Sequence, residues 1–328
     1  MTPSKITVTR IFDNNRDEEA TKAEEARHMI KFENIGARTH SPKKILRSAL
    51  HPAGLTVSAD DPNEILGLTH DNHRTIFQSN LAIALYLLPR ARRKDALRFY
   101  NLCHSIDECV DSPTRTLQEK ENILKTALQT LEKLREECHL DPMLLEQIMQ
   151  GMQMDLSINR YETFEDLRLY AWRVASAVGL VSAQLFGASG VNVNNYAEQL
   201  GLALQLTNIL RDVALDAAMN RIYIPLEDLT RFQVTETEIL SSSPSPQATH
   251  LFEFEAERAL SIFVKARLAW EKMSREERLL MRPAHLMELI YRGLLKKMQH
   301  DRYDLFHQRY RIGIFQKIIL ATQVFFSC

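Results

Sequence analysis

The sequence predicts an all-α protein, and three features carry that prediction. Apolar residues recur at three- and four-residue intervals through most of the chain, as on the buried face of an amphipathic helix. Alternation with a period of two, which predicts strands, is almost absent. Glycine and proline number only ten and eleven among 328 residues, so tight turns are few. A hydrophobic content of 45% is enough to bury a sizeable core.

The first 68 residues differ in character from the rest of the chain. Charged patches there alternate with turn residues, and the apolar periodicity is weak, so we expect a weakly ordered N-terminal extension over 1–68. Acidic residues such as Asp13 and Asp17 interrupt any apolar run, so no signal peptide is predicted. From 69 to 328 the helical periodicity is sustained, which predicts a single helical domain.

Helix boundaries follow from breakers and caps, taken in chain order. Pro89 and Pro113 each stop a helix, and Thr163 opens another in a capping box with Asp166. Gly187–Gly190 and the asparagine-rich stretch after it predict a loop. The predicted helices cover 74–88, 91–111, 117–138, 142–156, a segment from 163 through 173, a segment around 205–216, 235–239, and two or three long helices from 251 to the end.

A polar stripe runs along the predicted helix around 205–216. At about 100° per residue, Gln205, Asn208, Asp212 and Asp216 fall on one face. Two carboxylates four residues apart repel each other unless a cation lies between them. Carboxylate oxygens at this spacing favour Mg²⁺, which also binds phosphate oxygens. A single Asp-x-x-x-Asp is more often a solvated acidic turn, so this stripe alone predicts no site.

A second stripe of the same kind lies about a hundred residues earlier. Tyr100, His104, Asp107 and Asp111 share one face of the helix predicted over 91–111. If the two helices face each other, four carboxylates surround one cavity, and protons or metal ions must neutralise them. Mg²⁺ bridging to a diphosphate would do so. Two unrelated solvated stripes remain the alternative.

The chain from about 69 to 328 resembles the squalene/phytoene synthase family of head-to-head prenyltransferases. The matching stretches are 87–90, 107–111, 151–155, 170–179 and, with the highest specificity, 205–225. The resemblance implies an isoprenoid-synthase helical bundle around a central cavity. It also implies dependence on Mg²⁺ and two prenyl diphosphate substrates that are joined at their C1 carbons.

The resemblance further implies roles for individual residues. The catalytic set comprises Tyr170, which faces the reacting carbons, and four Mg²⁺–diphosphate ligands: Asp107, Asp111, Asp212 and Asp216. The substrate-binding set, in which the two valines line the hydrocarbon tunnel, is Tyr100, His104, Val174, Val178, Gln205, Asn208, Arg211, Tyr291 and Arg309. His104 stands where the family usually has arginine, which would make one diphosphate contact weaker or pH-dependent.

The hypothesis that follows is a Mg²⁺-dependent farnesyltransferase. It joins two farnesyl diphosphates, through a cyclopropyl diphosphate, to presqualene diphosphate or squalene. The residues at 173–179 slightly favour this reaction over phytoene synthesis. NADPH enters only if the reaction proceeds to squalene. One alternative is a phytoene synthase that joins two geranylgeranyl diphosphates. Another is a non-catalytic assembly factor, which the presence of all four aspartates disfavours.

Charge and cysteine content limit the partners and the compartment. A net charge of −1 predicts no nucleic-acid partner. No metal-site spacing links the cysteines, so we expect reduced thiols in a cytoplasmic protein: Cys103, Cys109, Cys138 and Cys328. Neither 174–195 nor the apolar 312–326 reaches about twenty predominantly apolar residues, so no spanning helix is predicted. Peripheral contact of the C-terminal segment with a membrane stays open, as does the oligomeric state.

Overall fold

The computed structural model describes residues 80–110, 112 and 114–327. All of them belong to the second of the two units into which the chain divides, Val57–Cys328. The predicted extension over 1–68, its boundary with the helical domain, and Asp111 lie outside the described residues. Within them the prediction of an all-α fold is confirmed. They form helices without a strand, apart from one isolated bridge between Arg160 and Ile222.

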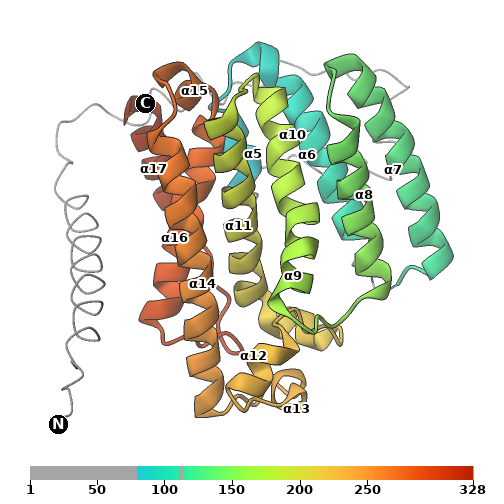
Figure 1. The fold of residues 1–328 in the computed structure, drawn as a ribbon, viewed down its shortest axis with the longest axis vertical. Helices are drawn as coiled ribbons and strands as arrows, with labels where there is room; N and C mark the ends of the chain where they lie inside the picture. Colours follow the sequence, from blue (N-terminus) through green and yellow to red (C-terminus); the bar gives the residue numbers. More distant parts are fainter. Residues whose placement is uncertain (1–79, 111, 113, 328) are drawn as a thin grey trace, which may run out of the picture. The chain divides into compact units, whose positions relative to one another are not determined.

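The first half of the described chain forms the helices that are coloured from cyan to yellow-green in Figure 1. The elements in chain order are α5 (Asn80–Leu85), α6 (Arg90–Val110), α7 (Leu117–Cys138), α8 (Pro142–Ser157), α9 (Phe164–Ala171), the π-helical segment η2 (Trp172–Ser176), α10 (Ala177–Phe186) and α11 (Val191–Ala218). The second half consists of α12 (Leu226–Arg231), α13 (Glu236–Leu240), α14 (Pro246–Glu271), α15 (Arg275–Leu280), α16 (Arg282–His300) and α17 (Ile314–Ser327).

Local capping explains why several helices begin where the sequence predicts. The Thr163 hydroxyl accepts a hydrogen bond from the Asp166 amide, and the Asp166 side chain accepts one from the Thr163 amide, which completes the predicted box. Thr235 forms an equivalent box with Glu238 at the start of α13. Such caps satisfy amide groups that the helix itself leaves without partners.

The loop predicted after Gly190 is wrong, because the asparagine-rich stretch forms the first turns of α11. Val193 and Tyr196 in these turns are fully buried. The Asn192 amide nitrogen donates to the Lys272 carbonyl at 3.2 Å. Burial of apolar side chains therefore outweighs the low helix propensity of asparagine at this position.

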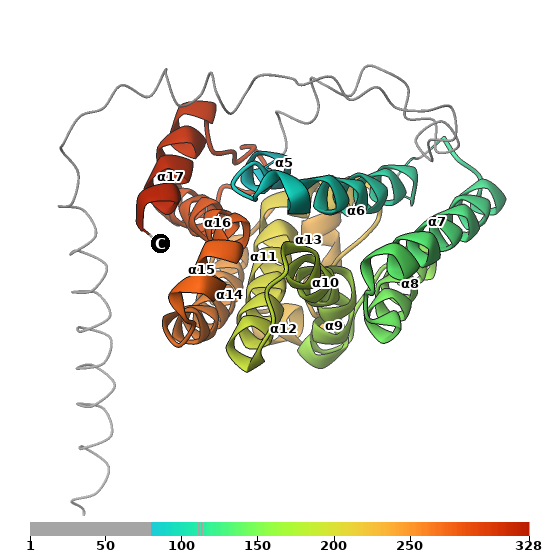
Figure 2. The ribbon, with the colours of Figure 1, turned by 90° about the horizontal axis from the view of Figure 1, so that it is seen from above.

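Helix α11 is the centre of the bundle. It packs against α14, η2, α10 and α16. Figure 2 shows α5 and α6 crossing one side of it, α14 to α16 on a second side, and α9 and α10 on a third.

Backbone hydrogen bonds fix the end of α11 beside the α8–α9 connection. The Ile222 amide donates to the Asn159 carbonyl at 3.0 Å, and the Leu226 amide donates to the Tyr161 carbonyl at 2.9 Å. The C-terminal ends of α8 and α11 therefore lie together with the start of α9. These three segments lie at the bottom of the bundle in Figure 1.

Two glycines let the π-helical segment pack closely against its neighbours. A Cβ atom on Gly201 of α11 would lie 2.6 Å from the Ala175 carbonyl oxygen, and one on Gly151 of α8 would lie 2.7 Å from Val174 Cγ1. Real Cβ atoms do not approach other atoms so closely. Gly179 of α10 is a third close packing point, since its Cβ would lie 2.8 Å from the Ala197 carbonyl oxygen.

One helix in the described part of the chain, Phe164–Phe186, is long and apolar enough to cross a bilayer by length and composition. It packs on α8, on α11 and, through α10, on α6. Its side chains Leu167, Ala171 and Val181 are fully buried. These contacts are those of a core helix.

Candidate active site

A cavity of about 1360 Å³ opens between the helices that surround α11. Its walls come from α5, α6, α8, α9, η2, α10, α11, α16 and the segment that leads into α17. Acidic, basic and amide side chains gather on part of the lining, and apolar side chains cover the remainder. A cavity of this size with a few convergent polar groups is the usual form of a small-molecule site.

Helix α6 contributes the first predicted stripe. Tyr100, His104 and Asp107 all line the cavity. The Tyr100 and His104 rings stack with centroids 5.7 Å apart, and His104 Nε2 lies 3.5 Å from the Glu108 carboxylate. The spacing predicted that these side chains share one helix face, and the structure places that face on the cavity.

Helix α11 contributes the second stripe, with Gln205, Asn208 and Asp212 on the cavity wall. Arg211 lies beside them and binds Asp212 through two nitrogens, with Nε to Oδ1 at 2.9 Å and Nη2 to Oδ2. Burial by itself would lower the pKa of Arg211, but hydrogen bonds with Asp212 and Tyr291 outweigh it and raise that pKa. A permanent cation thus stands beside the Asp212 carboxylate.

In this stripe of the described chain, the side-chain amide oxygen of Asn208 is a buried hydrogen-bond acceptor that is unsatisfied. Asn208 Oδ1 is buried and has no hydrogen-bond partner in the part of the chain that the structure describes. A buried acceptor without a partner costs about 1–3 kcal/mol, so this oxygen is available to a water molecule, an ion or a ligand. This oxygen and the carboxylates of Asp107 and Asp212 form a set of hard donors that suits Mg²⁺.

Two members of the predicted metal set stand apart from this arrangement. Asp111 lies outside the described residues. Asp216, one turn beyond Asp212, is half-buried but does not line the cavity. Among the described residues, no three acidic, histidine or cysteine side chains gather closely enough to hold an ion by themselves. A metal ion at this place would therefore need further oxygen ligands from water or substrate.

Tyr170 lies on the cavity wall within a cluster of three tyrosines. Its ring is 5.3 Å from Tyr161 and 5.4 Å from Tyr223, measured between centroids. The Tyr223 hydroxyl donates to Asp155 Oδ1 at 3.2 Å. Burial, followed by the nearby Asp155 carboxylate, raises the pKa of Tyr170 well above its usual value, so the hydroxyl keeps its proton.

Val174 and Val178 continue the wall above Tyr170, as predicted, and Ser182 and Phe186 extend it further. These residues follow one another at intervals of four from α9 through η2 to the end of α10. In an unbroken α-helix, four such steps would turn the last side chain about 160° away from the first. The wider turn of η2 offsets part of this rotation, so one wall of about 24 Å forms.

The remaining wall comes from α16, from the segment between α16 and α17, and from the first turn of α17. Tyr291 and Arg309 line it, as predicted. Arg311 and Lys317 line it as well, although no sequence pattern singled them out. The sequence has no local signal for these two cations, because their position depends on how the chain folds back after α16.

Asp155 is the main residue that the predicted site lacked. It ends α8, lines the cavity and accepts the hydrogen bond of Tyr223. A signal for it existed, since it closes the stretch 151–155 that carried part of the resemblance. No second carboxylate lies at helical spacing from Asp155, so no acidic stripe marks it in the sequence.

Comparisons with known proteins agree with this geometry. The profile described as squalene/phytoene synthase matches residues 77–316. The chain is 32% identical over 260 residues to the 15-cis-phytoene synthase of Synechocystis sp., which covers 71% of this chain and 76% of that protein. It is 30% identical over 269 residues to the phytoene synthase of Arthrospira platensis, which covers 71% of this chain and 84% of that protein.

Solved structures show the same fold at lower sequence identity. A dehydrosqualene synthase superposes with a TM-score of 0.65 at 22% identity, over 80% of this chain and 98% of that chain. A squalene synthase from Alicyclobacillus acidocaldarius gives a TM-score of 0.61 at 22% identity, over 74% and 94% of the two chains. At this identity the likeness concerns the fold and not the substrate.

Proposed function

Because the chain belongs to the squalene/phytoene synthase family, we propose that it joins two prenyl diphosphates head to head at their C1 carbons. The observation that carries the proposal is the division of one cavity into two parts. Asp107 and Asp212 from different helices line it together with Arg211, and apolar side chains of η2 and α10 continue the wall away from Tyr170. Such a cavity suits a ligand with a charged head and a long apolar tail.

Magnesium would be held by Asp107, Asp212 and the Asn208 amide oxygen, with Asp111 and Asp216 completing the predicted set. When bound, it neutralises the diphosphate and makes it a better leaving group. The protein itself supplies further positive charge through Arg211 and Arg309. These cations favour departure of the diphosphate from an allylic carbon.

The other side chains of the cavity would protect the allylic cation that remains. Val174 and Val178 exclude water from it. Tyr170 keeps its proton at neutral pH because of its raised pKa, so it presents a neutral ring and hydroxyl to the reacting carbons instead of a phenolate that would trap the cation. The Tyr223 hydroxyl and Asp155 hold this ring in place.

We propose two C20 geranylgeranyl diphosphates as the substrates and phytoene as the product. The preference for farnesyl diphosphate and squalene drawn from 173–179 is not confirmed, and the relatives at 30% to 32% identity carry the name phytoene synthase. Phytoene formation ends with loss of a proton and needs no reductant. Squalene formation requires a hydride from NADPH.

The test is incubation of the purified full chain with Mg²⁺ and either geranylgeranyl or farnesyl diphosphate, with and without NADPH, followed by mass spectrometry. We expect a C40 product from geranylgeranyl diphosphate without NADPH. A C30 product would overturn the substrate assignment but keep the reaction class. No product from either substrate would overturn the function.

Asp107→Ala and Asp212→Ala should each abolish product while the circular dichroism spectrum stays unchanged. Asp95→Ala is the matched control, because Asp95 lies on α6 outside the cavity and pairs with Arg98. Near-normal turnover of either cavity variant would contradict the assignment of these carboxylates.

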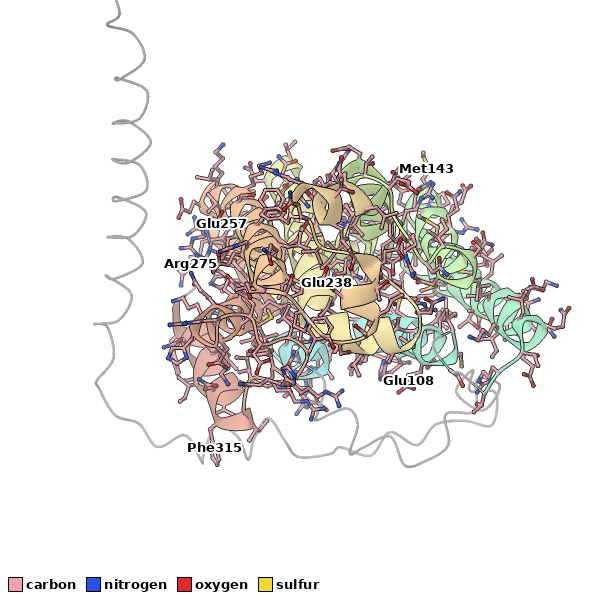
Figure 3. The ribbon with its side chains drawn as sticks, turned by 90° about the horizontal axis from the view of Figure 1, so that it is seen from below. Glu108, Met143, Glu238, Glu257, Arg275 and Phe315 are labelled. Carbon is pink, nitrogen blue, oxygen red and sulfur yellow. The ribbon has the colours of Figure 1, made fainter. Side chains whose placement is uncertain are left out.

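We further propose that α17 rests on a membrane surface, which would receive the apolar product. Its exposed side chains are mostly apolar, among them Phe315, which is 80% exposed and projects away from the helices in Figure 3. The others are Ile314, Ile319, Phe325 and Phe326. With 14 residues the helix is about 21 Å long, too short to span a bilayer.

The apolar face of α17 is continuous with the cavity, since Ile314 lines it beside the cations Arg309 and Arg311. These charges would complement an anionic lipid surface. Flotation with vesicles that contain phosphatidylglycerol should recover the protein, and the double variant Phe315→Ser, Phe326→Ser should remain unbound. Equal recovery of both proteins would refute this contact.

A further inference from the structure

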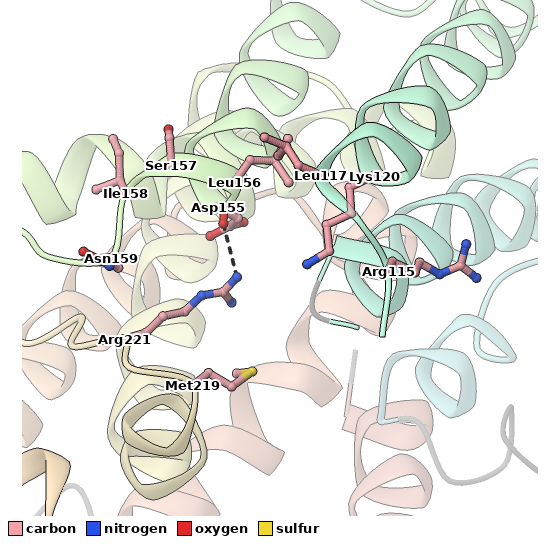
Figure 4. A pocket seen from close by; sticks show the side chains of 10 residues that line it. All are labelled: Arg115, Leu117, Lys120, Asp155, Leu156, Ser157, Ile158, Asn159, Met219 and Arg221. Atoms are coloured by element: carbon pink, nitrogen blue, oxygen red, sulfur yellow. Dashed lines mark hydrogen bonds between the residues drawn. The ribbon is translucent and has the colours of Figure 1, made fainter. Parts of the chain in front are cut away.

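A second pocket, of about 240 Å³, lies next to the cavity, and Asp155 lines both. Figure 4 shows it between the start of α7, the end of α8 and the segment that follows α11. It is lined by Arg115, Leu117, Lys120, Met219, Arg221 and the stretch 155–159. None of the functions proposed above uses it.

The pocket is positively charged. Its lining contains three cations, Arg115, Lys120 and Arg221, against the single carboxylate of Asp155. The Lys120 ammonium has no hydrogen bond or ion pair with any residue that the structure describes. In Figure 4 the side chains of Lys120 and Arg221 extend into the space between α7 and the end of α11, whereas Arg115 points outward.

The wall opposite Lys120 is held rigidly. Arg221 Nη2 donates to the Asp155 carbonyl at 3.1 Å. Arg160 ties the two segments of this wall together, since its Nη1 donates to the carbonyls of Asn159 and Asn220, each at 2.7 Å. The carbonyl oxygens of Asp155, in the last turn of α8, and of Asn159 and Asn220, just beyond the ends of α8 and α11, are therefore engaged, so they oppose an incoming anion less than open carbonyls would.

We propose that this pocket binds free inorganic diphosphate after it leaves the neighbouring cavity. The inference rests on the proposed function, in which each turnover releases two diphosphates beside Asp155. Two cations that converge on a small polar space favour an anion with several oxygens. The pocket has less than a fifth of the cavity's volume, so it can hold a free diphosphate but cannot enclose a prenyl chain.

The site would give the leaving diphosphate a place outside the cavity. A diphosphate that stays among the cavity cations blocks the next substrate. A second cationic pocket, separated from the first by one residue, lowers the free energy of that exit. We therefore expect the pocket to govern inhibition by product diphosphate.

Isothermal titration of the full chain with sodium diphosphate, in the presence of EDTA, tests the site without turnover. Removing Mg²⁺ weakens binding at the cavity carboxylates and leaves binding by cations. Lys120→Glu should weaken the affinity by about tenfold or more, because a charge-assisted contact becomes repulsive. Lys120→Arg should retain most of it, and Lys125→Glu, exposed on the same helix and outside the pocket, should change nothing.

The outcomes separate this inference from the proposed function. Two results would place the diphosphate in the cavity and overturn the proposal. One is equal affinity of wild type and Lys120→Glu, and the other is a loss of binding that Arg309→Glu causes and Lys120→Glu does not. Diphosphate binding that depends on Lys120 supports the pocket even if no prenyl substrate is turned over. With active enzyme, weaker inhibition of Lys120→Glu by added diphosphate would support the exit role, and unchanged inhibition would exclude it.

Discussion

Replacing Glu255 with glutamine should flatten the pH dependence of the protein's stability between about pH 5 and pH 8. Glu255 of α14 and Asp228 of α12 share one cation. Arg258 Nη1 donates to Asp228 Oδ2 at 2.9 Å and to Glu255 Oε1 at 2.7 Å. Both carboxyl groups are buried, with 5% and 6% of their side-chain surface exposed. One guanidinium cannot neutralise two buried carboxylates, so a proton must complete the balance.

The structure gives the magnitude of this effect. Burial, and less strongly the neighbouring Asp228, raises the pKa of Glu255 from 4.5 to about 8. The folded protein therefore holds one more proton than the unfolded chain between these two values. Stability from this proton is complete below pH 4.5 and is lost as the pH rises to about 8. At about 1.4 kcal/mol per pH unit, the loss from pH 5 to pH 8 is about 4 kcal/mol.

Urea unfolding at pH 5, 6, 7 and 8 would measure it. Glutamine is neutral at every pH, so the stability of Glu255→Gln relative to wild type should improve by about 4 kcal/mol between pH 5 and pH 8. Contributions of groups that do not interact with Glu255 cancel in this difference. Glu257→Gln, on the exposed side of the same helix, is the control and should show no trend. A wild-type-to-variant difference that is equal at pH 5 and pH 8 would refute the reasoning.

Three further variants test the site and its supports. Tyr223→Phe removes the hydroxyl that donates to Asp155 and should lower kcat about tenfold with little change in KM. An unchanged kcat would rule out the role of this hydroxyl in positioning Tyr170. Arg160→Ala removes the donor to the Asn220 carbonyl and one of the two donors to the Asn159 carbonyl, and it should lower the free energy of unfolding by about 0.5–1.5 kcal/mol in urea titration; an unaltered midpoint would contradict a role of Arg160 in joining these two segments. Gly201→Ala places a Cβ 2.6 Å from backbone and should cost about 1–3 kcal/mol or more, whereas Gly293→Ala, which meets only a side-chain methyl at 3.3 Å, should cost less; equal melting temperatures would disprove the close packing.

Features that depend on a single helix could be predicted from the sequence. The positions of Tyr100, His104 and Asp107 on one helix face follow from the period of 3.6 residues alone. So do those of Gln205, Asn208 and Asp212, and the structure places all six on the cavity wall. Capping is equally local, which explains why the boxes at Thr163 and Thr235 begin helices as their sequences indicate.

Features that depend on two or more helices could not be read in this way. The asparagines that open α11 became helical because Val193 and Tyr196 are buried by other helices. Asp155 has no periodic partner, and its role arises from Tyr223, which the chain reaches 68 residues later. The second pocket joins α7, α8 and the end of α11, so no single stretch of sequence contains its charge pattern.

The close contact at Gly201 and the cavity below it have one common cause. Gly201, Gln205, Asn208 and Asp212 fall on the same face of α11, within about 60° of one another. At Gly201 this face lies so close to the backbone of η2 that a larger residue would not fit. From Gln205 onward the same face carries side chains that line the cavity instead. One helix face therefore has two effects. It sets the distance between α11 and the wall that contains Tyr170 and Val174, and it carries the polar groups opposite that wall. A substitution at Gly201 should consequently alter substrate binding as well as stability, although no substrate atom would touch it.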